Sequence, residues 1–161
     1  MSAREAELVA RLSARGLTVA TAESLTAGLL ASRIAAVPGA SAVLRGGLVV
    51  YATDLKHTLA GVPDEVLARH GAVSCETAAA LADGARSRCG ADVGIGLTGV
   101  AGPDLQEGHP AGTVYVGVSG PDGHAEVLAP ALRGDRARIR EAACQVAVDR
   151  LLEILGNETS A

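Results

Sequence analysis

Aromatic side chains are almost absent from this 161-residue sequence, which has two tyrosines and neither phenylalanine nor tryptophan. Proteins that bind single-stranded nucleic acids commonly stack bases on aromatic rings, so this chain has little of that machinery. A net charge of −4 also argues against nonspecific binding to a phosphate backbone. We therefore expect a small-molecule ligand and no nucleic-acid partner.

Cysteine is scarce as well, because Cys75, Cys89 and Cys144 are the only three and form no CxxC pair. An odd number at these spacings fits buried, reduced thiols better than a disulfide framework or a zinc site. No apolar run reaches the length of a membrane span, and the N-terminus is charged where a signal peptide would be apolar. These absences predict a cytoplasmic protein that has no metal, cofactor or membrane partner.

Small aliphatic residues dominate what is present. Apolar residues make up 48% of the chain, and 161 residues suit one domain over 1–161 with a single core. The twenty glycines indicate tight turns and places where the backbone must approach a neighbour closely.

Helical periodicity alternates with short apolar runs along the chain. We expect helices over residues 3–15, 25–36, 53–60, 77–88 and 136–155, a short helix opened by Pro63, and strands over residues 17–22, 42–51, 91–98, 113–119 and 125–132. Ser74 is typical of a helix cap, and Pro121-Asp122-Gly123 indicates a hairpin. This order predicts an α/β fold with a mixed sheet of about five or six strands covered by helices on both faces.

Ser24 lies where a predicted strand leads into a predicted helix. Sheets of this kind bind ligands in such loops, here 21–28, 51–56 and 98–112. Backbone N–H groups at a helix N-terminus favour negative charge and could stabilise the oxyanion formed when a serine attacks a carbonyl. By its spacing alone this serine is more often a helix cap, and the two roles are compatible.

Lys56 is the only lysine and the strongest candidate for a base, because the four histidines follow no recognisable triad pattern. At its ordinary pKa near 10.4, only about one lysine in 2,500 is neutral at pH 7. A catalytic Lys56 therefore requires burial beside Ser24 and Tyr51, and a solvated charge is the simpler alternative. Ser-Lys pairs are an established variant of the catalytic triad.

Two further segments could bind a phosphate. Thr98-Gly99-Val100-Ala101-Gly102-Pro103 follows a strand, and its glycines permit close backbone approach, although a simple turn is the alternative. One or two of the four arginines at the start of the last helix could pair with a phosphate, whereas the others would lie on a solvated face: Arg133, Arg136, Arg138 and Arg140.

Taken together and in order, these segments resemble the CinA C-terminal domain family over roughly residues 5–155. The supporting segments are Thr21-Ala22-Glu23-Ser24, residues 37–41, Arg45-Gly46-Gly47, Tyr51 with Lys56, residues 70–74, residues 98–103, residues 112–115 and Gly134-Asp135-Arg136. The resemblance implies a three-layer α/β/α domain in its stand-alone form. It also implies a nicotinamide-nucleotide amidase of pyridine-nucleotide salvage, which converts nicotinamide mononucleotide to nicotinate mononucleotide and ammonia.

The resemblance also implies roles for individual residues. Ser24, Tyr51 and Lys56 match the catalytic set, and we expect Lys56, aided by the Tyr51 hydroxyl, to remove the Ser24 proton. The expected substrate contacts are Glu23, Thr26, Gly28, Thr98, Gly99, Ala101, Gly102, Arg136 and Arg140. Arg136 or Arg140 would bind the 5′-phosphate. Glu23 would face the cationic pyridinium ring, unless it has a structural role in its turn.

Two segments depart from the family pattern. Ala27 stands where the family usually has glycine, and residues 104–110 replace a loop that normally carries further glycines and a Lys-Pro pair. These departures leave open a serine amidase that acts on another small carboxamide, or a nucleotide-binding module without turnover. Apolar helix positions would permit a homodimer.

Overall fold

Five strands form one mixed sheet in the order β2-β1-β3-β4-β5 in the computed structural model, which describes residues 2–157. β1 (Val19–Glu23) lies between β2 (Leu44–Val49) and β3 (Val93–Gly99), and these three strands are parallel. β4 (Val114–Ser119) and β5 (Ala125–Leu128) continue the sheet in antiparallel pairing. The mixed sheet and the hairpin expected from the sequence are therefore confirmed.

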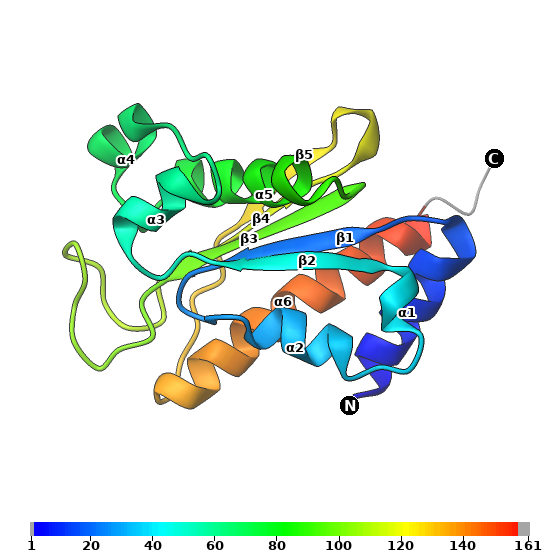
Figure 1. Cartoon of the computed structure of the whole chain (residues 1–161). Coiled ribbons are helices and arrows are strands. Elements are labelled where there is room, and N and C mark those ends of the chain that lie inside the picture. The colour runs from blue at the N-terminus through cyan, green and yellow to red at the C-terminus, as the bar shows by residue number, and fades with distance from the viewer. Residues whose placement is uncertain (1, 158–161) are drawn as a thin grey trace.

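Helices cover both faces of this sheet (Figure 1). One face carries α1 (Ala3–Arg15), α2 (Leu29–Ala35) and α6 (Arg136–Asn157), and the other carries α3 (Thr53–Thr58), α4 (Asp64–His70) and α5 (Cys75–Cys89). Two short 3-10 turns, η1 (Ala40–Ala42) and η2 (Pro121–Gly123), complete the elements. The three-layer arrangement is the one that the resemblance implied. No helix within residues 2–157 combines the length and hydrophobicity needed to cross a membrane.

Burial follows from this layering. Every residue of β1 and β3 is buried, because parallel strands at the centre of a sheet are covered on both faces. β2 lies at an edge, and its residues alternate between half-buried and exposed. Cys75 is exposed and only Cys144 is fully buried, which corrects the expectation that all three thiols are buried.

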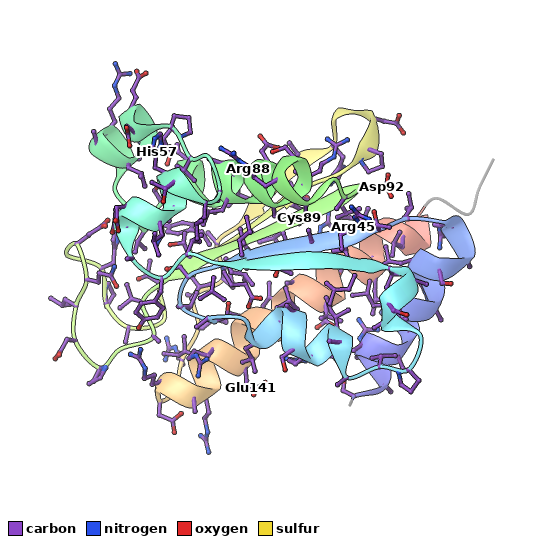
Figure 2. The ribbon with its side chains drawn as sticks, in the orientation of Figure 1. Arg45, His57, Arg88, Cys89, Asp92 and Glu141 are labelled. Carbon is purple, nitrogen blue, oxygen red and sulfur yellow. The ribbon has the colours of Figure 1, made fainter. Side chains whose placement is uncertain are left out.

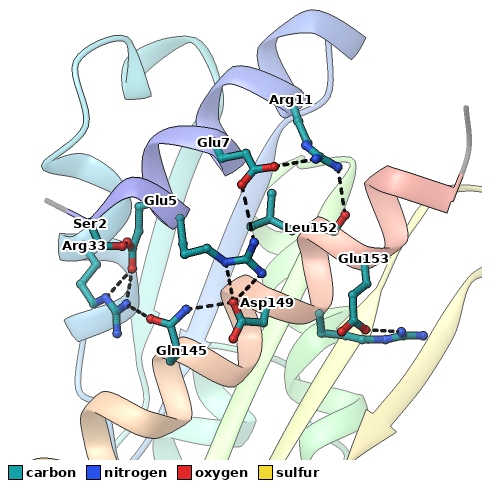
Figure 3. A network of polar contacts seen from close by, with 11 residues as sticks. Ser2, Glu5, Glu7, Arg11, Arg33, Gln145, Asp149, Leu152 and Glu153 are labelled. Atoms are coloured by element: carbon teal, nitrogen blue, oxygen red, sulfur yellow. Dashed lines mark hydrogen bonds and ion pairs between the residues drawn. The ribbon is translucent and has the colours of Figure 1, made fainter.

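Side-chain contacts hold the elements together on both faces. Glu5 on α1 is buried and pairs with Arg33 on α2, and Arg33 also donates to Gln145 Oε1 on α6 at 2.9 Å (Figure 3). On the other face, Arg45 Nε on β2 donates to the carbonyl of Cys89 at the end of α5, at 3.1 Å (Figure 2). These contacts join α1, α2 and α6 to one another and α5 to the start of β2.

α5 packs directly on the backbone of the sheet at Gly96 and Gly117, which pair across β3 and β4. A Cβ atom on Gly96 would lie 2.4 Å from the Ala78 carbonyl oxygen, and one on Gly117 would lie 2.2 Å from it. Neither residue has a positive φ, so space rather than backbone freedom requires glycine here. This close contact sets the distance between α5 and β3, the strand that leads into the 99–112 loop.

We expect Gly96→Ala to lower the free energy of unfolding by about 1–3 kcal/mol, because a methyl group there overpacks the α5 interface. Gly46→Ala on β2 is the matched control, since its Cβ would meet Cys89 Sγ at an ordinary 3.4 Å. Urea denaturation of both variants checks the prediction. Equal stability of the two variants would contradict it.

Candidate active site

A pocket of about 350 Å³ lies at the carboxyl ends of β1 and β3, beside the start of α6. Its lining consists of Ser24, Leu25, Tyr51, Arg136 and the continuous segment 99–106. A larger open cleft of about 640 Å³ lies between α5 and residues 60–66, and the only hydroxyl among its lining side chains, that of Ser87, donates to the Gly84 carbonyl at 3.4 Å. The pocket at the strand ends differs in that its lining serine, Ser24, contacts a lysine side chain.

Ser24 and Lys56 meet at this pocket. Lys56 Nζ lies 3.0 Å from Ser24 Oγ, and the exposed fractions of the two residues are 1% and 9%. Ser24 follows the last residue of β1, and its N–H donates to the Leu97 carbonyl of β3 at 2.8 Å. Lys56 projects from α3 and is also hydrogen-bonded to the carbonyls of Val50 (2.8 Å) and Tyr51 (3.2 Å). The burial required of a lysine base is thus present.

Burial lowers the pKa of Lys56 from 10.5 to about 8, against the opposing effect of the Glu107 and Asp54 carboxylates. About one molecule in ten would then carry a neutral amine at pH 7. A neutral amine has two N–H donors and one lone pair. The Val50 and Tyr51 carbonyls can accept both N–H groups, which leaves the lone pair for the Ser24 hydroxyl proton.

Tyr51 contributes its carbonyl, not its hydroxyl, to the contacts of Lys56. Tyr51 is 55% exposed, and its hydroxyl accepts a hydrogen bond from Arg136 Nη2 at 2.8 Å. Arg136 Nη1 donates to the Gly102 carbonyl at 2.7 Å, so this arginine bridges two walls of the pocket. The structure therefore corrects the expectation that the Tyr51 hydroxyl lies beside Lys56.

Asp135 Oδ1 accepts the Arg138 N–H at 2.9 Å and caps α6, which begins at Arg136.

The nucleophile turn, residues 24–28, separates β1 from α2. The sequence predicted a helix from residue 25, but α2 begins at Leu29 after Gly28, so Ser24 is not its cap. The Ala27 N–H donates to the Ser24 carbonyl at 3.0 Å, and Ala27 has a left-handed φ of 48°. Ala27 lies within the helix predicted over residues 25–36, but its backbone forms part of the turn.

Glu23 occupies the N-terminus of α2 in place of the serine. Its Oε1 accepts the Leu30 N–H at 2.9 Å, and its Oε2 accepts the Ala31 N–H at 3.1 Å and the Thr21 hydroxyl at 3.0 Å. Glu23 is fully buried and does not line the pocket. This corrects the expectation that Glu23 faces the pyridinium ring, and its structural alternative is the one that the hydrogen bonds support.

The other expected substrate contacts divide into two groups. Gly99, Ala101, Gly102 and Arg136 line the pocket, whereas Thr26, Gly28, Thr98 and Arg140 do not. The buried Thr98 hydroxyl donates to the Ala72 carbonyl at 2.6 Å. Of the two arginines expected as alternatives for the 5′-phosphate, only Arg136 lines the pocket, and the Arg140 guanidinium binds backbone carbonyls of the nucleophile turn.

The altered loop supplies pocket residues that sequence reasoning had left out. Asp104, Leu105 and Gln106 line the pocket, and Asp104 is the only carboxylate among its lining residues. Glu107 anchors this loop, because its carboxylate accepts the N–H groups of Ala72 (2.8 Å) and Val73 (3.3 Å). The sequence did contain a signal for Asp104, because it is an acidic residue in the loop that departs from the family pattern.

Unpaired backbone donors complete the site. Within residues 2–157, the N–H groups of Leu25 and Thr26 form no hydrogen bond to another protein atom, nor do those of Ala101 and Gly102. Leu25, Ala101 and Gly102 line the pocket together with Ser24. Groups of this kind can bind an oxyanion or a phosphate.

Comparison with known proteins identifies the family to which this chain is similar. Residues 1–155 match the model of the CinA C-terminal domain. A CinA-like protein of Frankia casuarinae is 52% identical over 141 residues, which are 88% of this chain and 32% of that protein. A putative competence-damage inducible protein of Geobacillus sp. is 53% identical over 123 residues, 76% of this chain and 30% of that one. The chain thus spans about a third of the length of these curated relatives.

Solved structures of similar chains have the same fold. A CinA superfamily protein from Escherichia coli superposes with a TM-score of 0.90 at 34% identity, covering 94% of this chain and 88% of that one. The competence/damage inducible protein CihA from Agrobacterium tumefaciens has a TM-score of 0.87 at 33% identity and covers 96% and 97% of the two chains.

We expect Glu23→Ala to lower the free energy of unfolding by about 2–4 kcal/mol, because two buried N–H groups of α2 lose their acceptor. Thermal and urea denaturation measure the loss. Glu153→Ala is the control, since its exposed ion pair with Arg150 should contribute less than about 1 kcal/mol. A Glu23→Ala protein as stable as the Glu153→Ala protein would show that the carboxylate is not needed as a cap.

Proposed function

Because this chain belongs to the CinA C-terminal domain family, we propose that it is an amidohydrolase that converts nicotinamide mononucleotide to nicotinate mononucleotide and ammonia. The observation that carries the proposal is the buried 3.0 Å contact between Lys56 Nζ and Ser24 Oγ. A lysine with its pKa lowered by burial is a suitable base for a serine. The product suits a role in pyridine-nucleotide salvage.

Acylation begins when neutral Lys56 takes the Ser24 hydroxyl proton. Ser24 Oγ forms a bond to the carboxamide carbon, and the carbonyl electrons move to its oxygen. Free N–H groups of the nucleophile turn and of residues 101–102 stabilise this oxyanion. The C–N bond then breaks, and the leaving nitrogen takes the proton from Lys56 and departs as ammonia.

Deacylation reverses the roles. Neutral Lys56 takes a proton from a water molecule, whose oxygen attacks the acyl carbon. The second tetrahedral intermediate collapses, the bond to Ser24 Oγ breaks, and Lys56 returns the proton to that oxygen. Nicotinate mononucleotide leaves, and the serine and the lysine regain their starting states.

The pocket suits a mononucleotide in size and charge. Its volume of about 350 Å³ lies in the range of small-molecule sites. Arg136 lines the pocket and can bind the 5′-phosphate through two N–H groups, exchanging its contact with the Tyr51 hydroxyl. The carboxylate available to the cationic pyridinium ring is that of Asp104 and not that of Glu23, because only Asp104 lines the pocket.

The central test is a coupled ammonia assay with nicotinamide mononucleotide. We expect Ser24→Ala to lower kcat by at least about 1,000-fold with an unchanged fold, because the nucleophile is lost. Nucleotide binding without ammonia release by the wild-type protein would favour a binding module instead. Faster release from free nicotinamide than from the nucleotide would favour an amidase with another substrate. Either result would overturn the proposal.

The pH dependence tests Lys56 as the base. Because only the neutral amine accepts a proton, kcat/KM should rise with pH and level off above an apparent pKa of about 8. Asp54→Asn should move this midpoint to lower pH, since the Asp54 carboxylate raises the pKa of Lys56. Glu65→Gln, an exposed acid on α4, is the control and should leave the midpoint in place. A profile that does not change between pH 6 and pH 9 would rule out this role for Lys56.

A further inference from the structure

Arg140 holds the nucleophile turn from the facing helix, α6. Its Nε donates to the Leu25 carbonyl at 2.9 Å, and its Nη2 donates to the Thr26 carbonyl at 3.0 Å. The side chain forms no ion pair with a carboxylate in the part of the chain that the structure describes. A full positive charge is therefore directed at two consecutive carbonyls next to Ser24.

Peptide planarity links these carbonyls to the free amides of the turn. In a trans peptide the C=O and the following N–H point in opposite directions. The Leu25 carbonyl points toward Arg140, so the Thr26 N–H points away from Arg140. The Ser24 carbonyl accepts the Ala27 N–H inside the turn, so the Leu25 N–H points out of the turn. Both outward N–H groups lack a partner within residues 2–157.

The turn needs an external support, because part of its backbone is unfavourable. Ala27 has a φ of 48°, a left-handed conformation that costs about 1–2 kcal/mol for a residue with a Cβ atom. A change of φ at Ala27 would relax the turn by rotating the Thr26–Ala27 peptide, and rotation of the Leu25–Thr26 peptide would exchange the outward Thr26 N–H for the Leu25 carbonyl. Two hydrogen bonds from a charged donor oppose this rotation.

We propose that Arg140 is a positioning residue: by binding the Leu25 and Thr26 carbonyls it holds the turn in the conformation that leaves the Leu25 and Thr26 N–H groups free for the oxyanion. This inference rests on the acylation of Ser24 in the proposed function. Arg140 and Arg136 are four residues apart on one face of α6 and have different tasks. Arg136 lines the pocket that binds the substrate, and Arg140 supports the backbone behind the nucleophile.

The first test is steady-state kinetics of Arg140→Ala, Arg140→Lys and Arg138→Ala with nicotinamide mononucleotide. Loss of an oriented oxyanion donor should lower kcat of Arg140→Ala by about 100-fold, with KM within about twofold and the pH midpoint unchanged. Arg140→Lys should fall between Arg140→Ala and wild type, since an ammonium cannot match the fork of a guanidinium. Arg138→Ala, an exposed neighbour outside the pocket, should behave as wild type.

Two kinetic outcomes would overturn the inference. A raised KM with unchanged kcat would assign Arg140 to substrate binding. A lowered melting temperature with unchanged kcat would assign it to stability alone. Where Arg140→Ala does not fold, Arg140→Lys decides, and a kcat equal to that of wild type overturns the inference.

A second test is independent of the substrate. A small alkyl fluorophosphonate phosphonylates an activated serine: Ser24 Oγ bonds to phosphorus, fluoride leaves, and Lys56 takes the proton. The phosphonyl oxygen then occupies the oxyanion position. Mass spectrometry should find labelling at least about tenfold slower in Arg140→Ala than in Arg138→Ala, and equal rates overturn the inference. A wild-type protein that is labelled but releases no ammonia from the nucleotide would refute the proposed function alone.

Discussion

The contact between one buried amine and one serine hydroxyl depends on the arrangement of the whole strand-end region. Ser24 is held by its N–H on Leu97, through the pairing of β1 with β3. The Val50 carbonyl that accepts from Lys56 belongs to a residue whose own N–H donates to the Glu23 carbonyl at 2.9 Å. One acceptor of the Lys56 amine is thus hydrogen-bonded to the last residue of β1, which immediately precedes Ser24.

The two helical layers contribute different side chains to the region around this contact. α3 supplies Lys56 from one face of the sheet, and α6 supplies Arg136 and Arg140 from the other (Figure 1). Capping by Asp135 sets where α6 begins, and therefore which arginine reaches the pocket and which reaches the turn behind the nucleophile. Lys56 therefore contacts Ser24 itself, whereas Arg140 contacts the two residues that follow it.

Much of the fold could be predicted from the sequence because hydrophobic periodicity and turn residues are local signals. The pairing of Ser24 with Lys56 was predictable once a lone lysine and a family resemblance were combined. Side-chain direction was harder to predict. Glu23 and Ser24 are consecutive at the end of a strand and point to opposite faces, so the glutamate caps α2 while the serine faces the pocket. Backbone groups such as the Val50 carbonyl leave no trace in a sequence, and the left-handed Ala27 looked like helix because alanine is a helix former.

Burial of Lys56 also links the stability of the fold to proton uptake. The amine has a pKa of about 8 in the folded chain and 10.5 as its ordinary value, so between these values the unfolded chain binds more protons than the native one. This group alone makes the native state increasingly favourable as pH rises through that window, and its penalty is fully present below pH 8. At neutral pH the protein therefore retains a destabilising group at its centre, as is common where a site needs a reactive side chain.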